Sequence, residues 1–171
     1  QAEDGIRDES LRLVGSEMCI RDRLRRYPFF SFMNHDQLDQ VAMITEETQV
    51  APGTVLFAAG DPADKLYLLR EGGVELHFTV IDERGMEKQQ DYLVGMINPG
   101  DMLGISALIR PYEYTTGALV SEASQLLVID AQQLRDLCDS DKDLAAEWHR
   151  QIAEVTLERL NYTRIQLLAA A

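Results

Sequence analysis

Residues 100–109 (GDMLGISALI), followed after a short link by residues 114–118 (YTTGA), are the stretch around which we interpret the rest of the chain. They predict a turn, one short apolar helical turn, and then a strand that carries two threonines. The first amide groups of a helical turn have no partner within the turn and point outward, so they can bind an anion. The stretch is therefore a candidate ligand site, with the expected members Gly104, Ile105, Ser106, Ala107, Thr115 and Thr116.

The chain before this stretch consists of short segments separated by glycine turns. In residues 74–81 (VELHFTVI), apolar positions alternate with polar ones, as in a strand that buries one face. This pattern places Phe78 and Val80 on the buried face and His77 on the polar, solvated face. Further strands are predicted at residues 48–50, 55–57, 65–69 and 91–97, with a polar hairpin tip at residues 82–85.

Two more strands follow at residues 117–120 and 125–129, and the turns between all these strands indicate an antiparallel barrel or roll. Asn34 and Asp130 are each placed to cap a helix, predicted to run to about residue 46 and about residue 138. Asp141 or Asp143 is expected to start a long helix that ends at about residue 168. The predicted fold is thus α+β, an antiparallel β-roll of the double-stranded, jelly-roll-like type with short N-terminal helices and a long C-terminal helix.

The long C-terminal helix carries two apolar stripes rather than one. The first consists of Leu144, Trp148, Ile152 and Val155, and the second, rotated from it, of Ala153, Leu157, Leu160 and Leu168. One stripe can pack against the roll, so the other has no predicted partner within the chain. We therefore expect a homodimer that forms through this helix.

Composition narrows the class of protein. With 171 residues, of which 46% are hydrophobic and 26% charged, the chain has the size and content of one globular domain. The net charge of −13 argues against direct nucleic-acid binding, because phosphate contacts need a basic face. No run approaches the roughly 18 apolar residues of a membrane span. The two cysteines lie far apart in the sequence, which fits a reducing, cytoplasmic setting. The cysteines and the three histidines show no metal-ligand spacing, so we expect no metal site.

Residues 1–22 differ from the rest of the chain. They contain the tripeptide Ile-Arg-Asp twice, at Ile6 and at Ile20, with little apolar periodicity between the two copies. The segment resembles translated read-through of sequencing adapters, and we interpret it as a non-native or disordered leader. The alternative is a native amphipathic arm. The domain itself is expected to span residues 23–171, with the roll at about 47–130 and the C-terminal helices at 131–168.

Six segments of the chain resemble, in order and spacing, the cyclic nucleotide-binding domain. They are residues 28–30 (PFF), 51–57 (APGTVLF), 60–69 (GDPADKLYLL), 71–74 (EGGV), 99–104 (PGDMLG) and 126–130 (LLVID). This family is the β-roll shared by bacterial regulators of the catabolite activator type and by kinase regulatory subunits. The resemblance covers about residues 24–168, and it implies a domain that binds a cyclic nucleotide and regulates an output.

The resemblance also implies a phosphate-binding cassette, which is degenerate here. In the family, Gly-Glu-x-Ala-Leu is followed by Arg-Ala or Arg-Ser; the glutamate binds the ribose 2′-hydroxyl and the arginine pairs with the cyclic phosphate. In this chain Ile105 stands at the glutamate position, and Tyr114 or Thr115 at the arginine position. Each missing hydrogen bond to a charged group is worth about 1.5–3 kcal/mol, enough together to weaken binding by orders of magnitude. Arg110, in the link, is a candidate replacement cation; the alternative is an exposed surface residue.

Three functional hypotheses remain open from the sequence. The first is a cytoplasmic sensor or regulatory domain of the cyclic nucleotide-binding type, with altered or lost nucleotide selectivity, whose ligand is a cyclic nucleotide or another small anion. The second is a dimerisation or partner-binding module that uses the roll as a scaffold. The third is a truncated transcription regulator without its DNA-binding domain. Catalysis is not expected, because no nucleophile and base pair and no paired carboxylates stand out.

Overall fold

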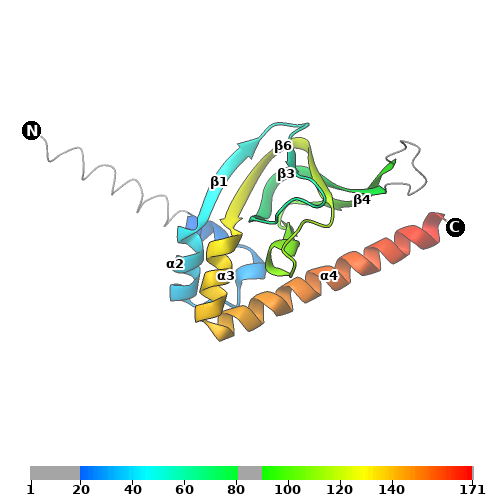
Figure 1. Ribbon diagram of the computed structural model, residues 1–171. Helices are drawn as coiled ribbons and strands as arrows, with labels where there is room; N and C mark the ends of the chain where they lie inside the picture. The colour runs from blue at the N-terminus through cyan, green and yellow to red at the C-terminus, as the bar shows by residue number, and fades with distance from the viewer. Residues whose placement is uncertain (1–19, 81–89, 171) are drawn as a thin grey trace, which may run out of the picture.

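The computed structural model describes residues 20–80 and 90–170 of the chain (Figure 1). The predicted hairpin tip at residues 82–85 and most of the predicted leader lie outside these residues. Residues 20–24 are helical, and Arg21 pairs with Asp39 of the following helix at 3.1 Å. The proposed limits of the leader and of the domain therefore stay predictions.

One antiparallel sheet forms the body of the molecule, as the sequence predicted. Its strands are β1 (Thr45–Val50), β2 (Val55–Phe57), β3 (Lys65–Val80), β4 (Gln90–Ile97), β5 (Met102–Leu103) and β6 (Gly117–Asp130). The strand order is β1-β6-β3-β4, with β2 paired to β6 and β5 paired to β3. The long strands β3 and β6 curl around the core, so the sheet closes into the expected β-roll (Figure 1).

Helices precede and follow the strands of the roll, and one short helical turn lies between β5 and β6. They are the 3-10 turn η1 (Pro28–Phe30), α2 (His35–Met43), the 3-10 turn η2 (Ile105–Leu108), α3 (Ala131–Ser140) and α4 (Lys142–Ala170). Asn34 caps α2 through a reciprocal capping box with Gln37, and Asp130 caps α3. Asp141 accepts hydrogen bonds from the first amides of α4. Both predicted caps and the first of the two alternatives for α4 are confirmed.

Several boundaries differ from the prediction. The segments expected at residues 65–69 and 74–81 are one strand, β3, whose pairing with β6 shifts register around Gly72. The predicted strands at 117–120 and 125–129 likewise join into β6. Helix α2 ends at Met43 rather than near residue 46, because Thr45 already pairs with Ile129 at the start of β1. Tertiary pairing thus overrides the local helical pattern.

The outer end of β3 is less buried than its alternating pattern predicts. Phe78 and Val80 are 47% and 45% exposed, so their expected burial is wrong. The β3–β4 pairing shifts register between Leu76 and His77, and beyond this bulge the two strands extend past the core. His77 does lie on the polar face, where it contacts Glu75 at 3.1 Å and Asp91 at 2.9 Å.

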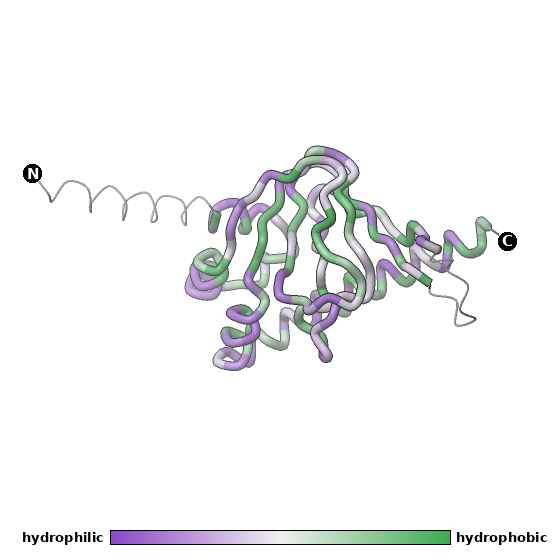
Figure 2. The backbone as a smooth tube through the Cα atoms, turned by 45° about the horizontal axis from the view of Figure 1, so that its top comes forward, coloured by the Kyte–Doolittle hydropathy of each residue, from purple (hydrophilic) through white to green (hydrophobic). Residues whose placement is uncertain are grey.

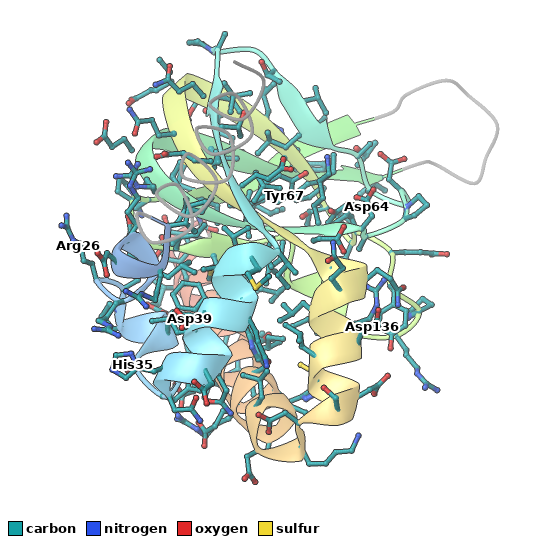
Figure 3. All side chains as sticks on the ribbon, turned by 90° about the vertical axis from the view of Figure 1, so that its left-hand side faces the viewer. Arg26, His35, Asp39, Asp64, Tyr67 and Asp136 are labelled. Atoms are coloured by element: carbon teal, nitrogen blue, oxygen red, sulfur yellow. The ribbon has the colours of Figure 1, made fainter. Side chains whose placement is uncertain are left out.

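The apolar residues form two clusters, one inside the roll and one between the roll and the helices. Trp148 of α4 is fully buried in the helical cluster, with the rings of Phe29, Phe30 and Phe32 at 5.2, 5.9 and 6.3 Å. Figure 3 shows α2 and α3 side by side in front of α4, with Tyr67 inside the roll above them. The helical cluster therefore fixes the first turns of α4 against the domain.

Helix α4 leaves this cluster and runs along the roll toward β4 (Figure 1). In Figure 2 its far half alternates between hydrophobic and hydrophilic residues. Leu157 and Leu160 in this half are 57% and 45% exposed. The helices in the described part of the chain include none long and apolar enough to cross a membrane.

Candidate ligand-binding site

A cavity of about 440 Å³ lies between the roll, η2 and α4. This volume is within the range of small-molecule sites, about 300–1,000 Å³. The wall from the sheet and η1 is mostly apolar and consists of Phe29, Phe57, Leu76, Val94, Gly95, Met96 and Ile97. The α4 wall is mixed and consists of Val155, Thr156, Glu158, Arg159, Tyr162 and Thr163. The cavity thus joins the predicted cradle to the long helix.

The cradle begins at Gly104, which adopts the left-handed conformation with φ 77°. A Cβ atom here would meet the Lys65 carbonyl oxygen at 3.0 Å and the Tyr114 ring at 3.3 Å, so both conformation and space require glycine. The Ala107 N–H donates to the Gly104 carbonyl at 3.0 Å and closes the turn. The amides of Ile105 and Ser106 precede this bond and are the first amides of the predicted helical turn.

Tyr114, at one of the two candidate arginine positions, is part of the wall. Its ring stacks on Phe57 at 3.8 Å, and its hydroxyl donates to the Lys65 carbonyl at 2.7 Å. Burial, followed by the neighbouring Tyr67, raises the pKa of the Tyr114 phenol far above its ordinary value, so this group stays neutral. Tyr114 therefore stiffens the site as a structural residue. Thr115, the other candidate position, is exposed and lines the cavity.

An arginine of α3 holds the back of the cradle. Arg135 donates to the Ala107 carbonyl at 2.6 Å, and its guanidinium lies 4.5 Å from the centre of the Tyr112 ring. These contacts bind the end of η2 and the link after it to the helical side of the domain. The position of the cradle therefore depends on α3 as well as on β5.

The structure brings most of the predicted site residues together. Gly104, Ile105, Ser106, Thr115 and Thr116 all line the cavity, and Ile105 also packs against the helical cluster. Ala107 is fully buried beneath the turn and is not part of the lining. Arg110 is exposed and also lies outside the lining, so the structure does not place its charge in the cavity.

Sequence reasoning missed Arg159, the only cation among the described residues that line the cavity. It donates a hydrogen bond to the carbonyl oxygen of Met102 in β5, and it is half-buried. Its signal was present in the sequence. Positions 148, 152, 155 and 159 fall on one face of a helix, so an arginine continues the otherwise apolar stripe that packs toward the roll.

The site thus lies in an antiparallel β-roll that a long helix closes, with a cavity between that helix and the turn at Gly104. The model of the family described as the cyclic nucleotide-binding domain matches residues 47–141. The chain belongs to this family, and the resemblance noted from the sequence is confirmed.

Similar proteins support the same assignment. A solved protein of Geobacter metallireducens, described as cyclic nucleotide-binding, is 32% identical, with a TM-score of 0.70 over 82% of this chain and 97% of that one. The anaerobic regulatory protein of Pasteurella multocida is 31% identical over 71% of this chain and 39% of its own length. A protein of Rhodopseudomonas palustris named as a potassium channel is 25% identical over 80% of this chain and 31% of its own length.

The chain thus spans less than half of the length of these two curated relatives. Their names describe regulation and a channel, and not a catalytic activity. Among the described residues, no group of three His, Cys, Asp or Glu side chains is arranged to hold a metal ion. The comparisons therefore support a regulatory domain of the cyclic nucleotide-binding class.

Proposed function

We propose that this chain is a cytoplasmic regulatory domain that senses a small ligand in the cavity between the roll and α4, with altered or lost cyclic nucleotide selectivity. The observation that carries the proposal is the cradle itself. Gly104, Ser106, Thr115 and Thr116 line a cavity of about 440 Å³, while Ile105 occupies the glutamate position of the family. The frame for a ligand is retained, and the two charged contacts for a cyclic nucleotide are not.

Titration calorimetry with cyclic AMP and cyclic GMP tests the selectivity. We expect either no detectable heat or dissociation constants well above the micromolar range, because two hydrogen bonds to charged groups are missing. Submicromolar binding of either nucleotide would contradict the proposal. It would mean that Ile105 and Thr115 do not weaken the site.

Restoring the two charges sharpens this test. The double variant Ile105→Glu/Thr115→Arg should bind cyclic AMP at least about a hundredfold more tightly than the original chain, from two contacts of about 1.5–3 kcal/mol each. The matched control is Ile105→Gln/Thr115→Met, which has similar side-chain size without the charges. An equal gain in both variants would show that packing, and not charge, limits nucleotide binding.

A second function, dimerisation through α4, is favoured by exposed apolar residues on that helix. Leu157 and Leu160 are 57% and 45% exposed. Ile165, Leu167 and Leu168 are more exposed than either of them. A second copy of the chain would cover this surface and connect two cavities. Sedimentation equilibrium should therefore give a dimer at micromolar concentration. A monomer throughout that range would contradict this proposal and leave the ligand proposal intact.

We also propose which process the domain regulates. The match to the Pasteurella multocida regulator covers 39% of that protein. The third candidate function is therefore that of the sensing part of a transcription regulator. We propose that this chain does not bind DNA directly, since its net charge is −13. A shift of promoter fragments by the purified chain in gel mobility experiments would refute this.

A further inference from the structure

Arg159 is the cation of the described cavity lining, which also contains the carboxylates of Asp101 and Glu158. Its guanidinium donates to the Met102 carbonyl, and within the described part of the chain it makes no ion pair. A guanidinium has five N–H donors in a planar fork, so one carbonyl leaves most of its binding capacity unused. A half-buried charge in this situation is costly unless another group satisfies it.

Burial is the main influence on this side chain. It lowers the pKa of the Arg159 guanidinium, and the nearby carboxylates of Asp101 and Glu158 raise it by less. Both carboxylates are exposed, and that of Asp101 accepts the Asn98 N–H at 2.9 Å in the preceding turn. Water therefore screens them more than it screens Arg159. The positive charge at this point of the cavity is only partly balanced.

The rest of the cavity sets the shape and polarity of a ligand. Opposite Arg159, the wall from the sheet is apolar and includes Phe57, Leu76 and Ile97. Hydroxyl groups of Ser106, Thr115 and Thr116 lie at the cradle and can bind neutral polar groups. The described lining holds one cation, Arg159, beside the exposed carboxylates of Asp101 and Glu158, so a ligand with several negative charges would be poorly matched.

We propose that Arg159 binds the acidic group of the ligand, and that the ligand is an organic anion with one acidic group and an apolar body. This inference rests on the proposed function, because it concerns the same cavity. The cation of this site would then come from α4 and not from the strand after η2. A planar acidic group would accept two parallel hydrogen bonds from the fork of the guanidinium.

This assignment couples the ligand to the helix. Arg159 already joins α4 to β5, since Met102 stands two residues before Gly104 of the cradle. A bound anion would add a second connection between α4 and the roll through the same side chain. Ligand binding should therefore hold α4 more firmly against the cradle, at the helix that the second proposed function uses for dimerisation.

Two fluorescent probes that differ by one charge test the inference. 8-Anilinonaphthalene-1-sulfonate has an aromatic body and one anionic group, and N-phenyl-1-naphthylamine has the same body without the sulfonate. Their affinities are measured on the original chain and on Arg159→Met, Arg159→Lys and Arg164→Met. Arg164 is an exposed arginine of the same helix outside the cavity lining, so it is the matched control.

We expect Arg159→Met to weaken binding of the sulfonate probe by about ten- to a hundredfold, the value of one hydrogen-bonded charge contact. Arg159→Lys should restore part of that loss, Arg164→Met should change nothing, and the neutral probe should bind all four proteins within about threefold. Equal losses for the two probes, or unchanged binding of the sulfonate probe in Arg159→Met, would overturn the inference. Thermal unfolding of each variant confirms that it is folded.

A cavity-filling variant separates this inference from the proposed function. Gly95 pairs with Leu76 in the sheet, and both residues line the cavity. A Cβ atom added at Gly95 would lie 3.8 Å from Cδ1 of Leu76, an ordinary van der Waals contact. In Gly95→Phe both probes should lose binding. If both probes keep their affinity there, they bind elsewhere and both proposals fail for this cavity. If Gly95→Phe blocks both probes and Arg159→Met changes neither, only the role of Arg159 fails.

Discussion

The two halves of α4 have similar apolar content and opposite surroundings. In the first half Leu144, Trp148 and Ile152 are buried, and they hold the helix against α2, α3 and the roll. After Ile152 no residue of the helix is buried within the described chain, although Leu157 and Leu160 continue the apolar pattern. One continuous helix thus passes from the core of the domain to a largely exposed surface.

This difference separates stability from signalling along one element. Burial of large side chains fixes the first half, so it can serve as a rigid base. The second half carries Arg159 and Thr163 toward the cavity and leucines away from it. A segment held by few buried contacts responds more readily to a ligand or a partner. If the two halves are independent, substitutions in the first should change stability and substitutions in the second should change association.

The largest expected effect is on stability, from Trp148→Ala in the first half. Truncating a fully buried tryptophan should lower the free energy of unfolding by about 3–5 kcal/mol, because it leaves a cavity among Phe29, Phe30 and Phe32. Urea unfolding at fixed protein concentration measures the change. The control is Leu167→Ala, 71% exposed in the second half, which should change stability by less than about 0.5 kcal/mol. Similar losses in both variants would remove the distinction between the halves.

The second prediction concerns association. Leu157→Asp and Leu160→Asp should each weaken the proposed dimer by about thirtyfold or more, since a charge would then be buried in an apolar interface. The folded monomer should keep its stability, because both side chains are exposed within the chain. Sedimentation of both variants measures the dissociation constant. Gln166→Asp adds the same charge on another face of the helix and is the control; an equal effect there would point to net charge and not to the leucines.

The sequence predicted the fold well where local chemistry decides it. Asn34 and Asp130 were recognised as caps, because their side chains satisfy amides that any helix leaves free. It failed where distant partners decide. The end of α2 depends on the pairing of Thr45 with Ile129, and the exposed Phe78 lies where β3 pairs with β4 beyond the bulge at Val94 of β4. Neither is encoded in the neighbouring residues.

The candidate site shows the same division. The glycines and threonines of the cradle could be placed from their order, and five of the predicted residues line the cavity. The role of Tyr114 depends on stacking with Phe57, far away in sequence, so it was not predictable. Arg159 lies about 50 residues beyond the cradle, and only its position on the apolar stripe of α4 indicated that it faces inward.

The smallest expected effect on stability comes from Asp141, which attaches the start of α4 to α2. Asp141 accepts hydrogen bonds from the Gln37 side chain at 2.7 Å and from the Leu144 and Asp143 amides at 3.0 and 3.1 Å. These bonds, that from Gln37 foremost, lower the pKa of the Asp141 carboxyl. A lowered pKa in the folded chain means that the charged form stabilises the fold above the pKa of the unfolded chain. This stabilisation is lost as the pH falls through the lower, folded value.

Asp141→Asn should therefore destabilise the protein at pH 7, by less than Trp148→Ala does. This difference in the free energy of unfolding should shrink as the pH falls below the ordinary aspartate pKa of about 3.9. Asparagine still caps a helix, so the difference reports the charge and not the cap. Urea unfolding across this pH range measures it, with Asp143→Asn, which removes the same charge two residues on, as the control. A difference that does not vary with pH would assign the attachment to hydrogen-bond geometry alone.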